Sequence, residues 1–178
     1  KALSEHTDNL FFADPYLDFG VPRLLTSLRQ LETYTSLTAP ITFRPAAVKL
    51  IEALHKTPIY RMGEKLIRGS LHESVKDSHV IVGAMGDLEA FSEKELDGKT
   101  VITSRVTESA LDWFRSRKVA MVVDYSPWLE GRPVGVNVME AMISAALSRT
   151  PEQLGADDFL DVIQTLGIEP RILYPNGY

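Results

Sequence analysis

The fold is decided by the stretch Val119-Ala-Met-Val-Val-Asp124, which passes through a loop rich in Gly and Pro into the segment 138–147. Its five consecutive apolar residues, three of them Val, predict a strand covered on both faces, as in a parallel sheet. After the loop, apolar residues recur at the spacing i, i+3, i+4, i+7, which predicts an amphipathic helix. They are Met139, Met142, Ile143 and Ala146. The order is therefore strand, loop, helix.

Two further strands are expected before this one, at His79–Val82 and Thr100–Thr103. A helix from Glu108 to Ser116, capped by Thr107, connects the second strand to the third. Alternating strands and helices predict parallel strands, because a right-handed crossover returns each strand beside its predecessor. We therefore expect an α/β, Rossmann-like fold, with an open, mostly parallel sheet and helices on both faces.

The flanking regions give weaker patterns. Before the alternating region we expect a strand at Leu10–Ala13, a helix from Pro22 to Tyr34, a connection with strand character over Thr38–Phe43, and helices from Pro45 and from Glu64 to Lys76. After it we expect a helix that starts at Thr150 and ends at Gly167, and an edge strand at Arg171–Tyr174. Two organisations follow: a single α/β domain over residues 1–178, or a helical region 1–75 followed by a Rossmann-like half, 76–178. Because the chain starts at Lys1 without Met, we expect a piece of a longer protein.

Composition limits the partners. The 178 residues carry a net charge of -5 without a basic run, which argues against nucleic acid, because neutralising phosphates needs clustered Lys and Arg. No apolar run approaches the roughly 20 residues that cross a bilayer, so we expect no membrane partner and a cytoplasmic location. Without Cys, and with four His that lack ligand spacing, no metal is expected. A small molecule is the expected partner, and Ala141, Ala145 and Ala146 leave an oligomer open.

Candidate ligand-contact residues follow the first two expected strands of this region. Gly83-Ala-Met-Gly86 could let a ligand approach a bare backbone, although an ordinary strand-to-helix turn explains the same glycines. The hydroxyls of Thr103 and Ser104, with the Arg105 guanidinium and the next helix N-terminus, could hold a carboxylate or phosphate. Helix capping explains the hydroxyls equally well.

Arg132 and Asn137 lie in the Gly/Pro loop. An Arg can grip a carboxylate with two hydrogen bonds, and an Asn can donate to and accept from a hydroxyl, so the pair suits a polyhydroxy acid. In the competing interpretation Asn137 is the N-cap of a helix that starts at Val138, and Arg132 is a solvated surface residue.

Three segments carry a family resemblance: Leu96–Thr107, Leu129–Ala141 and Arg149–Leu154. Together they resemble the C-terminal portion of a bacterial family of quinate 5-dehydrogenases, with the match best from Val80 onward. The most specific piece is the pattern Gly-Arg-x-x-Gly-x-Asn-Val-Met-Glu at Gly131–Glu140. The resemblance implies a Rossmann-like domain, a preceding half upstream of this chain, and NAD or NADP as the cofactor.

With such a cofactor, Asp14 takes the place of the acid that binds a ribose hydroxyl after the second strand of a Rossmann unit. An Asp before Pro is otherwise a common turn residue. The expected cofactor contacts are Asp14, Gly83, Gly86, Thr103 and Ser104, and the expected substrate contacts are Arg105, Arg132 and Asn137.

The expected function is that of an NAD(P)-dependent dehydrogenase of the quinate/shikimate type, which binds a small polyhydroxy acid at the C-terminal edge of the sheet. The sequence assigns no catalytic acid or base. Two alternatives stay open: a non-catalytic small-molecule-binding or sensing domain on a Rossmann-like fold, and a nucleotide-sugar transferase or epimerase-like enzyme.

Overall fold

The computed structural model describes residues 7, 9–19, 24–42, 53, 57, 69, 71–129 and 131–177. The chain forms two compact units, Lys1–Asp77 and Ser78–Tyr178. The second unit holds the strands that the sequence placed in one sheet, and the described part of the first unit is mainly helical.

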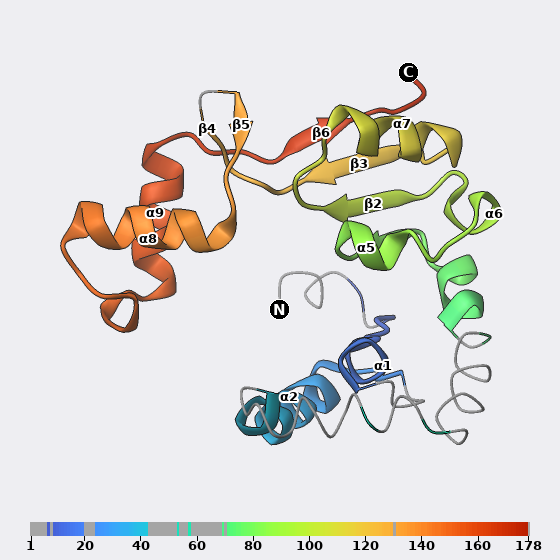
Figure 1. Cartoon of the computed structure of the whole chain (residues 1–178), viewed down its shortest axis with the longest axis horizontal. Helices are drawn as coiled ribbons and strands as arrows, with labels where there is room; N and C mark the ends of the chain where they lie inside the picture. Colours follow the sequence, from blue (N-terminus) through green and yellow to red (C-terminus); the bar gives the residue numbers. More distant parts are fainter. Residues whose placement is uncertain are drawn as a thin grey trace. The chain divides into compact units, whose positions relative to one another are not determined.

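The sheet of the second unit contains β1 (Val80–Val82), β2 (Thr100–Thr103), β3 (Met121–Asp124) and β6 (Arg171–Leu173), in the order β1-β2-β3-β6. The first three strands are parallel and β6 is antiparallel to β3. The prediction of a mostly parallel sheet in an α/β protein is confirmed, and the arrowheads of β2 and β3 point to one edge in Figure 1. The residues that follow the parallel strands therefore start from a common edge.

One face of this sheet is buried. Val101 and Thr103 of β2 lie in register with Val122 and Asp124 of β3, and all four are buried. Helix α7 (Glu108–Ser116) contributes the fully buried Phe114 to the same core. On the opposite face of the edge strand β1, Val80 and Val82 are 46% and 55% exposed.

The connections differ from the expected ones by a few residues. β3 starts two residues later than predicted and includes Asp124. Helix α5 (Met85–Leu88) begins within the Gly83–Gly86 segment, and α6 (Glu93–Leu96) carries a Ser92–Glu95 capping box. Thr107 caps α7 as predicted, since its Oγ1 accepts from the Ala110 N–H at 3.3 Å.

The Gly/Pro loop is more ordered than predicted. It forms a hairpin of β4 (Trp128–Leu129) and β5 (Arg132–Pro133). Helix α8 (Val136–Leu147) then starts with Gly135 as its N-cap. The interpretation of Asn137 as the N-cap is wrong, because the Gly135 carbonyl accepts from the N–H groups of Val138 and Met139 and so closes the first turn before Asn137.

The C-terminal helix is interrupted. The Thr150 capping box is present but opens only a single turn, η2 (Pro151–Gln153), and α9 (Ala156–Thr165) starts afresh from Gly155. Helices α8 and α9 pack on one another (Figure 1). Gly167, predicted to follow the helix end, has φ +62° as that position requires.

The first unit corrects three predictions. The expected strand at Leu10–Ala13 is reduced to an isolated bridge between Phe12 and Leu25, and α1 (Asp14–Phe19) follows it. The helix expected from Pro22 is α2 (Leu28–Thr42), which cannot start earlier because Leu25 is held in that bridge.

Helix α2 also covers residues 38–42 of the connection expected over Thr38–Phe43, whose last residue lies outside the described residues. The Thr38 hydroxyl donates to the Tyr34 carbonyl one turn earlier. The helix expected from Pro45 lies outside the described residues except for Ala53, which is helical. The next expected helix is observed over 71–77, and its earlier part is outside them except for Gly69, which is also helical.

Gly98 provides a test of the turn before β2. Its φ is +70°, so Gly98→Ala should lower the free energy of unfolding by about 1 kcal/mol, because a Cβ is strained in the left-handed region. The control is Gly86→Ala, where an added Cβ meets no atom within 4 Å inside α5. Urea unfolding should show no loss for the control, and equal losses would contradict this description of the turn.

Candidate functional site

A hollow opens at the carboxyl end of β2, between α5 and the start of α7. It has a volume of about 360 Å³ and is lined by Met85, Glu89, Arg105, Thr107, Ser109, Ala110 and Trp113. Its location is the edge of the parallel strands, where open α/β sheets bind their ligands.

The polar groups of this hollow suit an anion that also carries hydroxyls. Arg105 and Glu89 are exposed and come from different elements. In the part of the chain that the structure describes, no group accepts from the Glu108 and Ser109 N–H groups at the start of α7. Unpaired helix N-terminal N–H groups and a guanidinium both favour negative charge. The Glu89 carboxylate can accept hydrogen bonds from ligand hydroxyls.

Arg105 is held by its backbone. Its φ is +55°, in the left-handed region that residues with a Cβ rarely adopt. The Arg105 N–H donates to the Ser126 Oγ, and the next N–H, that of Val106, donates to Asp124 Oδ2 at 3.2 Å. Asp124 is the last residue of β3 and Ser126 lies two residues beyond it, so the neighbouring strand fixes the turn that presents Arg105.

Asp124 is fully buried and gathers several donors. Its Oδ1 accepts from the Ser126 N–H at 3.0 Å, and its Oδ2 also accepts from the Trp128 Nε1–H at 3.0 Å. The Arg171 guanidinium lies 3.6 Å from the centre of the Trp128 ring, with one nitrogen 3.9 Å from Oδ2. The carboxylate therefore links β3, the Arg105 turn and the β4–β5 hairpin.

Only one residue predicted as a ligand contact, Arg105, lines this hollow. Thr103 is fully buried, and its hydroxyl has no hydrogen-bond partner in the described ranges, while Ser104 is partly exposed. Gly83 donates its N–H to the Ile102 carbonyl at 3.2 Å, and Gly86 lies inside α5. Packing does not require either glycine, since an added Cβ would meet no atom closer than 3.8 Å.

The other predicted contacts lie elsewhere. Arg132 is exposed on β5, and Asn137 is exposed in the first turn of α8. Neither side chain forms a hydrogen bond or ion pair with another described residue. Asp14 starts α1 in the first unit. Arg132 and Asn137 therefore do not line the hollow at β2, and Asp14 belongs to the other unit.

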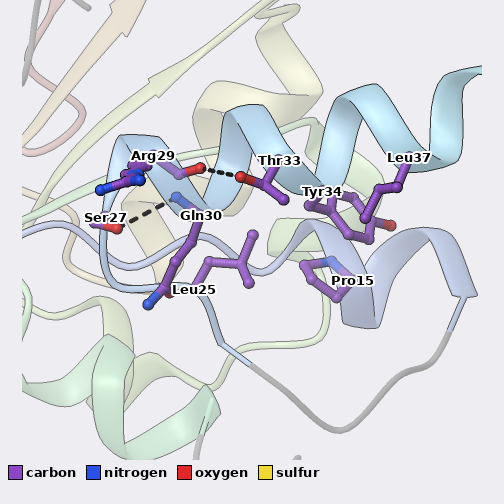
Figure 2. Close-up of a pocket in the computed structure, with 8 residues that line it drawn as sticks. All are labelled: Pro15, Leu25, Ser27, Arg29, Gln30, Thr33, Tyr34 and Leu37. Carbon is purple, nitrogen blue, oxygen red and sulfur yellow. Dashed lines mark hydrogen bonds between the residues drawn. The ribbon is translucent and has the colours of Figure 1, made fainter.

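The first unit has a larger hollow, of about 620 Å³, shown in Figure 2. Two of its hydroxyls bond to the backbone of α2: the Ser27 Oγ accepts from the Gln30 N–H at 3.3 Å, and the Thr33 Oγ1 donates to the Arg29 carbonyl at 2.8 Å (dashed lines in Figure 2). The Tyr34 hydroxyl donates to the Asp14 carbonyl at 3.5 Å. The Gln30 amide oxygen accepts from the Thr26 N–H. The smaller hollow at β2 offers more unpaired polar groups and is the better candidate site.

An ion pair stabilises the amino edge of the sheet, away from this site. The Lys118 Nζ lies 2.7 Å from Glu93 Oε1, and its hydrogen bond and charge lower the pKa of Glu93. The same pair raises the pKa of Lys118. Its contribution is present above the ordinary pKa of Glu and is lost as the pH falls through the lowered value.

Sequence reasoning missed Glu89 and Asp124. Asp124 carries a local signal, because an Asp that accepts from the N–H two residues later forms an Asx-turn, and Ser126-Pro127 suits one. Its link to Val106 spans 18 residues and depends on the pairing of β2 with β3. Glu89, the residue that follows α5, carries no local signal that places it at the hollow.

The fold and the hollow define a mixed α/β protein with a small, mostly parallel sheet and a polar site at its carboxyl edge. The chain belongs to the family described as "Domain of unknown function (DUF8754)", whose model matches residues 1–175. No curated protein and no solved structure matches the chain. Over the described residues, no helix is long and apolar enough to cross a membrane, and no three His, Asp or Glu side chains gather as a metal site would need.

Trp128→Phe tests the carboxylate cluster. Losing the indole donor to a buried carboxylate should lower the free energy of unfolding by about 2 kcal/mol. The matched control is Trp113→Phe, because the Trp113 indole N–H donates to no other described residue. Urea unfolding should show a clearly smaller loss for the control; the reverse order would exclude a stabilising role for the Trp128 hydrogen bond.

Proposed function

We propose that the chain binds a small polyhydroxy acid in the hollow at the carboxyl end of β2, on a Rossmann-like open sheet with helices on both faces. The observation that carries the proposal is the convergence of Arg105, Glu89 and the first N–H groups of α7, which have no acceptor among the described residues, around one hollow. The guanidinium and the helix N-terminus would bind the acid group. Glu89 would accept hydrogen bonds from the hydroxyls.

The size of the hollow supports a small ligand. Small-molecule sites commonly enclose about 300 to 1,000 Å³, and this hollow has about 360 Å³. A single sugar-sized acid fits that volume better than a dinucleotide does. A binding or sensing domain needs only this site, whereas a dehydrogenase needs a second site for its cofactor.

NAD(P)-dependent dehydrogenation of the quinate/shikimate type is the second candidate, favoured by the sequence pattern at Gly131–Glu140. The described residues do not fit a dinucleotide cradle. Helix α5 has only four residues, and no positive φ or close contact requires Gly83 or Gly86. We therefore assign no catalytic step to this chain. A nucleotide-sugar transferase or epimerase would face the same requirement for a nucleotide site.

Arg105→Gln tests the proposed site. Removing the charged donor should weaken quinate binding at least about tenfold, because a hydrogen bond to a charged group contributes roughly 1.5–3 kcal/mol. Calorimetric titration with quinate and with shikimate measures the effect. Arg29→Gln is the matched control, an Arg lining the hollow of the first unit, and it should leave the affinity unchanged. Equal affinities for Arg105→Gln and the unmodified chain would refute the site.

Arg132→Gln and Asn137→Ala test the loop residues, with titrations of NAD+, NADP+ and UDP alongside. Both side chains are exposed and unbonded, so each variant should keep its free energy of unfolding within about 0.5 kcal/mol. Loss of quinate binding in these variants, with Arg105→Gln unaffected, would move the acid site to the loop. NAD(P)+ binding with reduction in the presence of quinate would favour the dehydrogenase, and UDP binding the transferase or epimerase.

A further inference from the structure

We propose that Asp124 is the positioning residue of the hollow: its buried carboxylate sets where Arg105 and the start of α7 stand. This inference rests on the proposed binding function for the role of Arg105. Asp124 does not line the hollow, so it acts through the groups that it holds. The chemistry is that of a carboxylate that accepts from backbone N–H groups of a ligand-binding turn.

The side-chain hydrogen bonds of Asp124 lie at the carboxyl edge of the parallel strands. Its donors are the N–H groups of Val106 and Ser126 and the Trp128 indole, and all of them follow the ends of β2 and β3. Ser126, itself 2% exposed, extends the contact by accepting from the Arg105 N–H. Two successive N–H groups of the turn, at positions 105 and 106, are thereby fixed from the neighbouring strand.

This double attachment explains the conformation of Arg105. A non-Gly residue in the left-handed region persists only where its surroundings determine it. The Arg105 and Val106 N–H bonds lie on either side of the Arg105 Cα, and so they hold its φ at +55°. Without the carboxylate, the turn would relax and the guanidinium would lose its fixed approach to the helix N-terminus.

The same carboxylate also holds the hairpin. The Trp128 indole donates to Asp124 Oδ2, and Arg171 of β6 covers the Trp128 ring. The β4–β5 hairpin, which carries Arg132, therefore shares its anchor with the Arg105 turn. Asp124 therefore holds both the turn that presents Arg105 and the hairpin that follows β3.

Hydrogen exchange of the chain of residues 1–178 tests this role without any ligand. In the unmodified protein the Val106 amide should be protected while the nearby Ser109 amide exchanges freely; similar rates at both would overturn the proposal even if no variant folds. In Asp124→Asn the exchange of Val106 should rise about tenfold, because the three donors then share one neutral amide oxygen in place of two charged oxygens. Asp87→Asn, the same change at an exposed position of α5, should leave it unchanged.

Quinate titration of the same proteins separates positioning from general stability. Asp124→Asn should weaken binding about tenfold and cause a smaller loss when added to Arg105→Gln, because residues that act through one another are not additive. A fully additive loss, or unmodified exchange at Val106 in folded Asp124→Asn, would overturn the proposal. If the unmodified chain binds no quinate, the proposed function fails, and the exchange measurement still decides whether Asp124 positions the turn.

Discussion

The buried carboxylate of Asp124 is the constraint on which the candidate site depends. A carboxylate removed from water is stable only when its oxygens are supplied with donors, and here backbone N–H groups and an indole provide them. These donors belong to the turn after β2 and to the segment after β3. The hydrogen bonds to one carboxylate therefore also set the relative positions of those segments. The site is thus organised by a polar requirement of the core and not by apolar packing alone.

The parallel sheet and α7 could be predicted from the sequence because their signals are local. Apolar runs of strand length, a Thr followed by Glu108 at a helix start, and short intervals between strands are all visible in a few residues. The start of α2 could not be predicted in this way, because Leu25 is withdrawn from the helix by its bridge to Phe12. The interruption after η2 likewise depends on Gly155 and Asp158, which compete as a second helix start.

The candidate site was predicted in part. A hydroxyl and guanidinium cluster at the end of β2 indicated Arg105, and that residue does line a polar hollow. The competing interpretation of Asn137 as a cap is wrong because Gly135, two residues earlier, already caps α8 through its backbone. The roles of Glu89 and Asp124 depend on where distant backbone segments meet, which periodicity and spacing do not encode.

The edge strand β1 has a consequence for the behaviour of the protein in concentrated solution. A strand at the border of a sheet exposes unpaired backbone groups, and long apolar borders recruit strands from other molecules into mixed sheets. At three residues, β1 offers very few such groups although two of its valines face outward. The short length of β1 therefore limits the addition of strands from other molecules, although its exposed valines would favour such addition.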